Sequence, residues 1–246
     1  MHHIAVFAAT SDLEPAARAL AEQLHLPFAE QANYQLLLTA DYLGLRKTAE
    51  KSLPLFIDFL SGKLAYRRQH LSIRREALAR ALGLKMNRNP LIVDATAGLA
   101  QDGFVLAALG FDIQLIERSP IVYALVNDGI QRALKNPDIN PIVSRMHLIQ
   151  GNAITLLKEM TTQPDIVYLD PMFPERKKTA LAKIAMRIFH DIVGDDEDAD
   201  SLLETALACA TERVVVKRPR LAAELAGLKP SYSLSGSSSR FDIYIR

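Results

Sequence analysis

The sequence predicts an α/β protein: a doubly wound, mostly parallel sheet of seven strands, preceded by a small α+β unit. From Asn89 onward, apolar runs of strand length alternate with segments of helical periodicity, which is typical of a parallel sheet covered on both faces. Two further apolar runs, joined through Gly236 and serines, end the chain and indicate a hairpin at one sheet edge. We therefore expect an N-terminal unit over residues 1–70 and a sheet domain over 71–246.

The N-terminal unit begins with an apolar run over residues 3–9, which predicts a strand. Ser11 and Asp12 could then cap a helix that continues to about Leu24, because its apolar residues share one helical face. Residues 34–39 and 55–60 are apolar runs of strand length, and Ser61-Gly62 suggests the turn of a hairpin.

In the sheet domain each predicted strand leads into a predicted helix. The strands are expected over 91–95, 112–117, 147–150, 165–169 and 214–217, the helices over 101–109, 120–135, 153–160, 178–193 and 200–211, and the closing strands over 232–235 and 241–245. Ligands of doubly wound sheets bind beyond the carboxyl ends of the strands. The residues that directly follow each strand are therefore the candidates for a site.

The composition excludes several classes of protein. With 246 residues, 49% of them hydrophobic and 23% charged, the chain is typical of soluble globular proteins. Its single cysteine, Cys209, lies in an apolar stretch, is expected to be buried and can form no internal disulfide. No apolar run approaches the roughly 20 residues of a membrane span, and the N-terminus lacks the pattern of a secretory signal. We therefore expect a cytoplasmic protein that does not enter membranes.

A basic stretch joins the two predicted units. Residues 63–88 contain eight basic residues and one acid, a local net charge of +7, although the whole chain carries only +1. Apolar residues from Ile73 to Leu82 give the stretch a helical face that could pack on the domain. The cations are then either a solvated helix face or a patch that contacts the phosphates of a nucleic acid.

The first predicted strand of the sheet domain leads into a loop of small residues, Ala95 to Ala100. Such a loop lets the backbone approach a ligand closely, and the helix that begins near Gln101 presents free N–H groups. The loop contains Gly98 but matches neither the G-x-G-x-x-G dinucleotide pattern nor the phosphate loop. A diphosphate cradle is therefore disfavoured.

The next two strands end in polar residues suited to a nucleoside. Glu117 follows Asp94 by 23 residues, where an acid can accept hydrogen bonds from both ribose hydroxyls. Alternatively, Glu117 pairs with Arg118 or caps the helix near Pro120. Asn152 follows the third strand, where it could contact an adenine edge or simply cap a helix.

The fourth strand ends in Asp170-Pro171-Met172-Phe173. An exocyclic amine on a base is a poor nucleophile because its lone pair is delocalised into the ring. The Asp170 carboxylate and a backbone carbonyl fixed by Pro171 could accept its two hydrogens and expose that lone pair, while Phe173 could stack on the base. The alternative is an ordinary Asp-Pro turn at a strand end.

These motifs resemble class I, Rossmann-like N-methyltransferases that use S-adenosylmethionine, whose amino-methylating members carry [N/D/S]-P-P-[Y/F/W]; Met172 departs from that pattern. A larger set of segments resembles the bacterial RsmJ family, in which Met172 is at home. The segments are Asp94–Gly98, Glu117-Arg118, Val167–Pro174, Val214–Pro219 and Arg240–Tyr244.

The resemblance implies a seven-stranded Rossmann-like methyltransferase sheet, S-adenosylmethionine as cofactor, and the N2 amine of a guanine in 16S ribosomal RNA as acceptor. The partner would be that RNA or the small ribosomal subunit. The residues expected at the cofactor are Asp94, Gly98, Gln101, Asp102, Glu117, Arg118, Asn152, Ala153 and Asp170. Other acceptors on the same scaffold are a DNA amine or a protein amide, and a non-catalytic RNA-binding assembly factor is the alternative of another class.

Basic residues near the strand ends could grip RNA phosphates on either side of the target. Together with the basic stretch, the candidates are Arg67, Arg68, Arg74, Arg75, Arg176, Lys177, Lys178, Lys217 and Arg218, unless they are ordinary solvated charges. The acidic run Asp195–Asp198 is expected to be solvated. No metal is expected, because the histidines lack ligand spacing and a sulfonium needs no Lewis acid to transfer its methyl group.

Overall fold

The computed structural model describes residues 3–50, 53–60, 71–172, 189, 191–194 and 196–246. Several predictions fall outside these residues. They are the hairpin at Ser61-Gly62, most of the helix over 178–193, the boundary between residues 70 and 71, and the site candidates Arg67, Arg68, Phe173, Arg176, Lys177 and Lys178.

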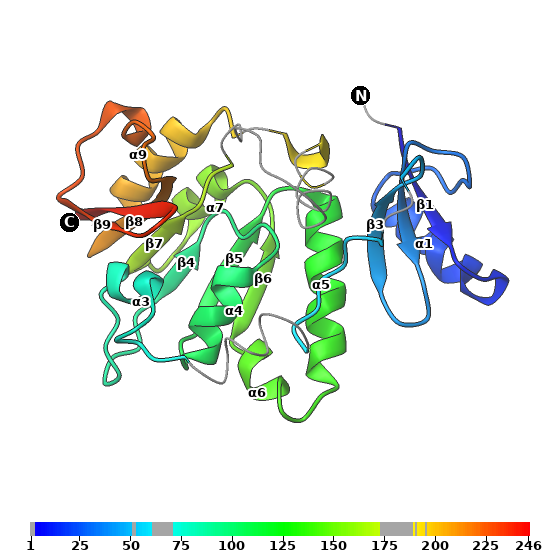
Figure 1. Cartoon of the computed structure of the whole chain (residues 1–246), viewed down its shortest axis with the longest axis horizontal. Helices are drawn as coiled ribbons and strands as arrows, with labels where there is room; N and C mark the ends of the chain where they lie inside the picture. The colour runs from blue at the N-terminus through cyan, green and yellow to red at the C-terminus, as the bar shows by residue number, and fades with distance from the viewer. Residues whose placement is uncertain (1–2, 51–52, 61–70, 173–188, 190, 195) are drawn as a thin grey trace.

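The larger sheet has seven strands, and the predicted α/β fold is confirmed (Figure 1). In hydrogen-bonded order they are β6 (Met146–Gln150), β5 (Ile113–Glu117), β4 (Ile92–Asp94), β7 (Ile166–Leu169), β8 (Arg213–Pro219), β10 (Ser239–Ile245) and β9 (Tyr232–Ser235). The first five run parallel, and β10 is antiparallel to both of its neighbours. The strand order reverses direction between β4 and β7, which is where such sheets bind ligands.

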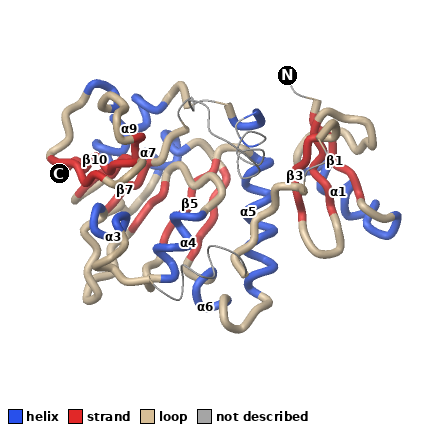
Figure 2. The backbone as a smooth tube through the Cα atoms, viewed as in Figure 1, coloured by secondary structure: helices blue, strands red, loops and turns tan. Residues whose placement is uncertain are grey.

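Helices cover both faces of this sheet (Figure 2). They are α3 (Ala77–Ala81), α4 (Gln101–Ala108), α5 (Pro120–Leu134), α6 (Asn140–Val143), α7 (Ala153–Glu159) and α9 (Ala199–Cys209). Successive residues of a strand point to opposite faces of the sheet, so they belong to different hydrophobic clusters. In β7, Tyr168 belongs to the cluster that includes α4 and α5, whereas Val167 and Leu169 belong to the cluster that includes α7 and α9. Cys209, expected to be buried, is only partly so.

The N-terminal unit has its own three-stranded sheet with α1 (Glu14–Gln23) against it. β1 (Ile4–Ala8) pairs parallel with β2 (Tyr34–Leu38), which pairs antiparallel with β3 (Leu43–Lys47). β3 was not predicted, because its glycine and basic residues interrupt the apolar pattern. The prediction of a strand over residues 55–60 is wrong. An isolated bridge between Leu55 and Leu45 joins this segment to β3.

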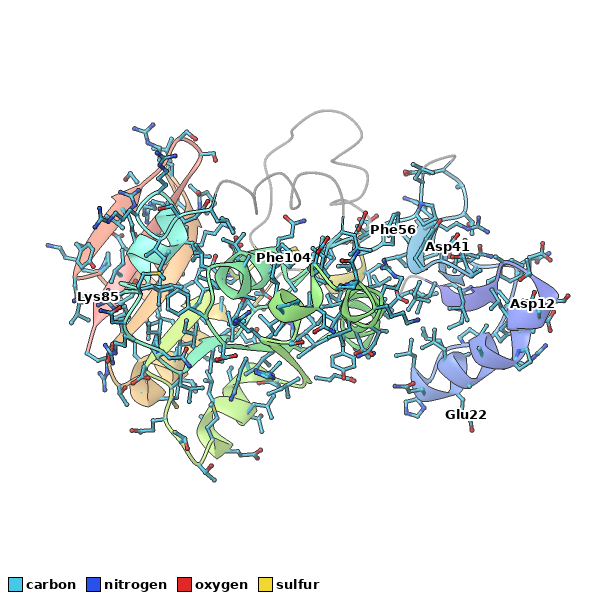
Figure 3. The ribbon with its side chains drawn as sticks, turned by 90° about the horizontal axis from the view of Figure 1, so that it is seen from below. Asp12, Glu22, Asp41, Phe56, Lys85 and Phe104 are labelled. Carbon is cyan, nitrogen blue, oxygen red and sulfur yellow. The ribbon has the colours of Figure 1, made fainter. Side chains whose placement is uncertain are left out.

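Residues 55–60 instead pack against the larger domain. A Cβ atom added to Gly129 of α5 would lie 2.7 Å from the Ile57 side chain, so the helix needs a glycine at this close approach. Phe59 stacks on Phe104 of α4 with ring centroids 5.1 Å apart. Figure 3 places Phe56 where the two units meet and Asp12 and Glu22 at the far end of the N-terminal unit.

The described part of the chain contains no helix that is long and apolar enough to cross a membrane.

Candidate active site

A cavity of about 780 Å³ lies beyond the carboxyl ends of the parallel strands. Its volume is within the roughly 300–1,000 Å³ of small-molecule sites. All of the residues expected at the cofactor line this cavity, and so does Pro171. The expected residues are Asp94, Gly98, Gln101, Asp102, Glu117, Arg118, Asn152, Ala153 and Asp170. The fold therefore brings together the strand-end residues that the sequence singled out.

One end of the cavity, the cofactor end, is formed by Glu117 and the small-residue loop. Gly98 has a φ of +50°, and its N–H donates to Glu117 Oε2 at 2.9 Å. The Ser119 N–H donates to Glu117 Oε1 at 2.7 Å. Burial raises the pKa of Glu117 to about 7, against the opposing effect of these two amides. The carboxylate is thus fixed by backbone groups rather than by the neighbouring Arg118.

Asp94 and Thr96 connect this loop to the other end of the cavity. Asp94 is 2% exposed and accepts the Thr96 N–H at 3.1 Å. Burial raises the pKa of Asp94 to about 8, so it is mostly protonated at neutral pH. Thr96 Oγ1 in turn accepts the Asp170 N–H at 2.6 Å. Sequence reasoning missed Thr96, which ties the first βα loop to the Asp-Pro motif.

The second end, the acceptor end, is a cluster of charges around Lys217. Its ammonium lies 2.8 Å from Asp102 Oδ2 and 2.8 Å from Asp170 Oδ2. The Tyr168 hydroxyl donates to Asp102 at 2.7 Å. Burial disfavours the ammonium, but the two carboxylates outweigh it and raise the pKa of Lys217. Lys217 is therefore a positive charge at neutral pH that is shared between two acids.

This arrangement corrects two of the predicted phosphate contacts. Lys217 binds carboxylates inside the cavity instead of reaching outward, because Asp102 and Asp170 offer it paired, low-dielectric partners. Arg218 is 7% exposed and donates to the Ala223 carbonyl at 2.6 Å, so its guanidinium supports the following loop. Arg74 and Arg75, which precede α3, are exposed, as contact with the phosphates of a nucleic acid would require.

Asn152 caps α7, since its Oδ1 accepts the Ile154 N–H at 2.9 Å and the Thr155 N–H at 3.3 Å. The capping alternative is thus confirmed. Contact with an adenine stays a prediction, supported by the exposed position of Asn152 at the cavity wall.

Two residues of the acidic run, Asp196 and Asp198, are ion-paired rather than simply solvated, which corrects the expectation for them; Asp195 lies outside the described residues. Arg118 donates to Asp196 and, at 2.8 Å, to Asp198. Asp196 also accepts the Met172 N–H at 2.5 Å. The side chains of Arg118, Asp196 and Asp198 line the cavity and form part of its wall.

The N-terminal unit also supports this wall. The Tyr34 hydroxyl donates to Asp191 Oδ2 at 2.6 Å, and Lys47 lies 3.9 Å from the same oxygen. Phe189 and Val193, on either side of Asp191, line the cavity.

Comparison with known proteins places this geometry in a family. Residues 19–246 match the model of the family described as "Putative SAM-dependent methyltransferase". The ribosomal RNA small subunit methyltransferase J of Thioalkalivibrio sulfidiphilus is 47% identical, over 98% of this chain and 97% of that protein. The chain belongs to the methyltransferase J family. The relative of the same name from Pseudomonas aeruginosa is 46% identical, over 97% of this chain and 93% of its own length.

The solved structure of another methyltransferase agrees with the fold. The crystal structure of a SAM-dependent methyltransferase from Neisseria gonorrhoeae is 36% identical and has a TM-score of 0.72, with 97% of this chain and 95% of that chain covered. The chain is accordingly an S-adenosylmethionine-dependent methyltransferase.

The cavity of this methyltransferase J family member fits that cofactor chemically. Two carboxyl groups, those of Asp102 and Asp170, bind the single ammonium of Lys217, and the buried, mostly protonated Asp94 lies beside them, so this part of the lining can accept a further positive charge. Glu117 offers a buried acceptor of the kind that ribose hydroxyls require. Among the described residues, no group of three His, Cys, Asp or Glu side chains could hold a metal ion.

Proposed function

We propose that this protein transfers a methyl group from S-adenosylmethionine to the exocyclic N2 amine of a guanine in 16S ribosomal RNA. The observation that carries the proposal is Asp170, which lies beyond β7, faces the same cavity as Glu117 and is bonded to Lys217 and Thr96. The resemblance to the RsmJ family supports the choice of guanine, and the printed names of the relatives support small-subunit RNA. The protein would act in the cytoplasm on this RNA or on the subunit.

Asp170 and Pro171 orient the amine. The carboxylate and the Pro171 carbonyl each accept one N–H, which draws the nitrogen toward tetrahedral geometry and exposes its lone pair. When bound, the cofactor supplies a methyl group already activated on a sulfonium. The positioning of the amine is then the main source of the rate enhancement, and residues of this chain provide most of that positioning.

Lys217 favours the ionised form of Asp170, which can accept a hydrogen bond from the amine. Burial raises the pKa of Asp170, and the charge of Lys217 opposes this rise. Once the N–C bond has formed, the nitrogen carries an excess proton, and the Asp170 carboxylate, as its proposed hydrogen-bond acceptor, is placed to receive it. Asp170 therefore orients the amine first and can take up the proton afterwards.

Other residues would hold the RNA. Phe173 is proposed to stack on the target base, and Arg67, Arg68, Arg74, Arg75, Arg176, Lys177 and Lys178 to contact flanking phosphates. A guanine that is paired in the resting RNA would have to be extruded, which costs a few kcal/mol. The proposed division into an N-terminal unit over 1–70 and a catalytic domain over 71–246 places part of this basic set at the junction.

The decisive experiment maps methylated nucleotides in ribosomal RNA from cells with and without this protein. We expect one N2-methylguanine of 16S RNA to be lost with the gene and restored with the wild-type protein. Purified protein, incubated with radiolabelled cofactor and RNA, DNA or protein in separate reactions, should label RNA alone. Label in DNA or protein would contradict the proposed acceptor, and failure to bind the cofactor in calorimetry would favour a non-catalytic assembly factor.

A further inference from the structure

Met172 stands where amino-methylating enzymes of this class carry a second proline. Proline has no backbone N–H and a fixed φ, so it restricts the loop and leaves no donor to satisfy. Methionine at this position restores both the rotation about φ and the backbone N–H donor. A free N–H in the wall of a partly buried cavity would be unfavourable without a partner.

Asp196 supplies that partner. The Met172 N–H donates to Asp196 Oδ2 at 2.5 Å, and the Asp196 N–H lies 3.5 Å from the Met172 carbonyl oxygen. The two residues are 24 positions apart in sequence. A side chain from the segment before α9 therefore fixes the peptide unit between Pro171 and Met172.

Fixing this N–H also directs a carbonyl. The N–H and C=O groups of one planar, trans peptide unit point in opposite directions. When Asp196 holds the Met172 N–H, the Pro171 carbonyl must point away from Asp196. That carbonyl is the group proposed to accept the second hydrogen of the guanine amine.

The anchor is itself held firmly. The Asp196 side chain is 14% exposed and is paired with Arg118, which also binds Asp198 at 2.8 Å. Arg118 directly follows Glu117 at the end of β5. The acceptor loop is thus connected through two side chains to the strand that carries the predicted ribose-binding acid.

We propose that Asp196 is a positioning residue that replaces the second proline by anchoring the Met172 N–H and so aiming the Pro171 carbonyl at the acceptor amine. The inference rests on the proposed function, because the amine is that of the guanine acceptor. It predicts that loss of Asp196 slows methyl transfer more than it weakens binding.

Asp196→Ala should lower kcat on 16S RNA about 10²-fold, the effect of misplacing a reacting group by about 1 Å. The KM for RNA and the cofactor Kd should change by less than about threefold, since misalignment acts mainly after binding. Asp196→Asn keeps an oxygen acceptor and should retain most of the turnover. The matched control is Glu197→Ala, which removes the neighbouring carboxylate; Glu197 is exposed and does not line the cavity, so its kcat should stay near that of the wild type.

Met172→Pro tests the replacement directly. A proline needs no anchor, so Met172→Pro should be active, and the double variant Met172→Pro, Asp196→Ala should recover most of the turnover lost in Asp196→Ala alone. If thermal melting shows that Met172→Pro is unfolded, the comparison of Asp196→Ala with Asp196→Asn and Glu197→Ala decides alone. Equal activities of Asp196→Ala and Glu197→Ala would overturn the inference. Wild-type protein that methylates no guanine would instead overturn the proposed function.

Discussion

The two ends of the cavity hold their carboxylates in different ways. At the cofactor end, Glu117 is held by the N–H groups of Gly98 and Ser119. At the acceptor end, Asp170 is held by the Lys217 ammonium, with its own N–H on Thr96. Burial raises the pKa of both carboxyl groups; the two backbone amides oppose the rise at Glu117, and the Lys217 ammonium opposes it at Asp170. Binding should therefore depend on local backbone, and turnover on one side chain from the neighbouring strand β8.

The largest effect is expected at the acceptor end from Asp170→Ala. Without the carboxylate the amine loses one of its two acceptors and the base that takes its proton, so kcat should fall about 10³-fold. The cofactor Kd should change much less than kcat, because Glu117 and the Gly98 loop, which are expected to hold the ribose, are untouched. Initial rates of methyl incorporation and calorimetry measure the two quantities. Retained turnover would remove Asp170 from the catalytic role.

Lys217→Met is expected to have the next largest effect. Lys217 lowers the pKa of Asp170, so its loss raises that pKa further and reduces the ionised fraction at any given pH. Turnover at neutral pH should fall about 10²-fold, with partial recovery as the pH rises. Lys217→Arg keeps the positive charge and should shift the profile much less. The profile of kcat against pH is the measurement, and identical profiles for Lys217→Met and the wild type would show that Lys217 does not control Asp170.

At the cofactor end the pH dependence should appear in binding. The pKa of Glu117 is raised to about 7, so lowering the pH protonates it and removes an acceptor for the ribose hydroxyls. Affinity scales with the ionised fraction and should fall about tenfold from about pH 8 to about pH 6. Glu117→Gln should bind weakly and without this dependence. Calorimetry over the pH range distinguishes the two, and a dependence that survives in Glu117→Gln would assign it to another group, such as Asp94.

The same contrast explains what could be predicted from the sequence. Asp94, Glu117, Asn152 and Asp170 lie at the carboxyl ends of strands or just beyond them, and these ends meet at one edge of a parallel sheet, so their convergence follows from the alternating pattern. The mostly parallel sheet and the hairpin at its edge follow from the same pattern, whereas the hydrogen-bonded order of the strands comes from the structure.

Partners that are distant in sequence could not be found in this way. Lys217 and Arg218 are adjacent basic residues at a strand end and look alike in sequence, yet one enters the cavity and the other supports a loop. Asp196 looked solvated because no sequence pattern indicates that Arg118 and Met172 will face it. Met172 was the available signal: a residue that restores a backbone donor at a site requires an acceptor nearby.

The smallest effect is expected from Arg74 and Arg75, which lie outside both ends of the cavity and are exposed. If these two residues contact RNA phosphates, the double variant Arg74→Ala, Arg75→Ala should have an unchanged kcat at saturating RNA. The slope of the logarithm of the RNA-binding constant against the logarithm of the salt concentration should be reduced in magnitude by about 1.4–1.8. Arg18→Ala is the matched control, since Arg18 is also exposed and contacts Glu14 on α1 and the ring of Phe28, both within the N-terminal unit. Filter binding of 16S RNA over a range of salt concentrations measures the slopes. An unchanged slope in the double variant would assign these cations to a solvated face and leave recognition to the residues at the mouth of the acceptor end.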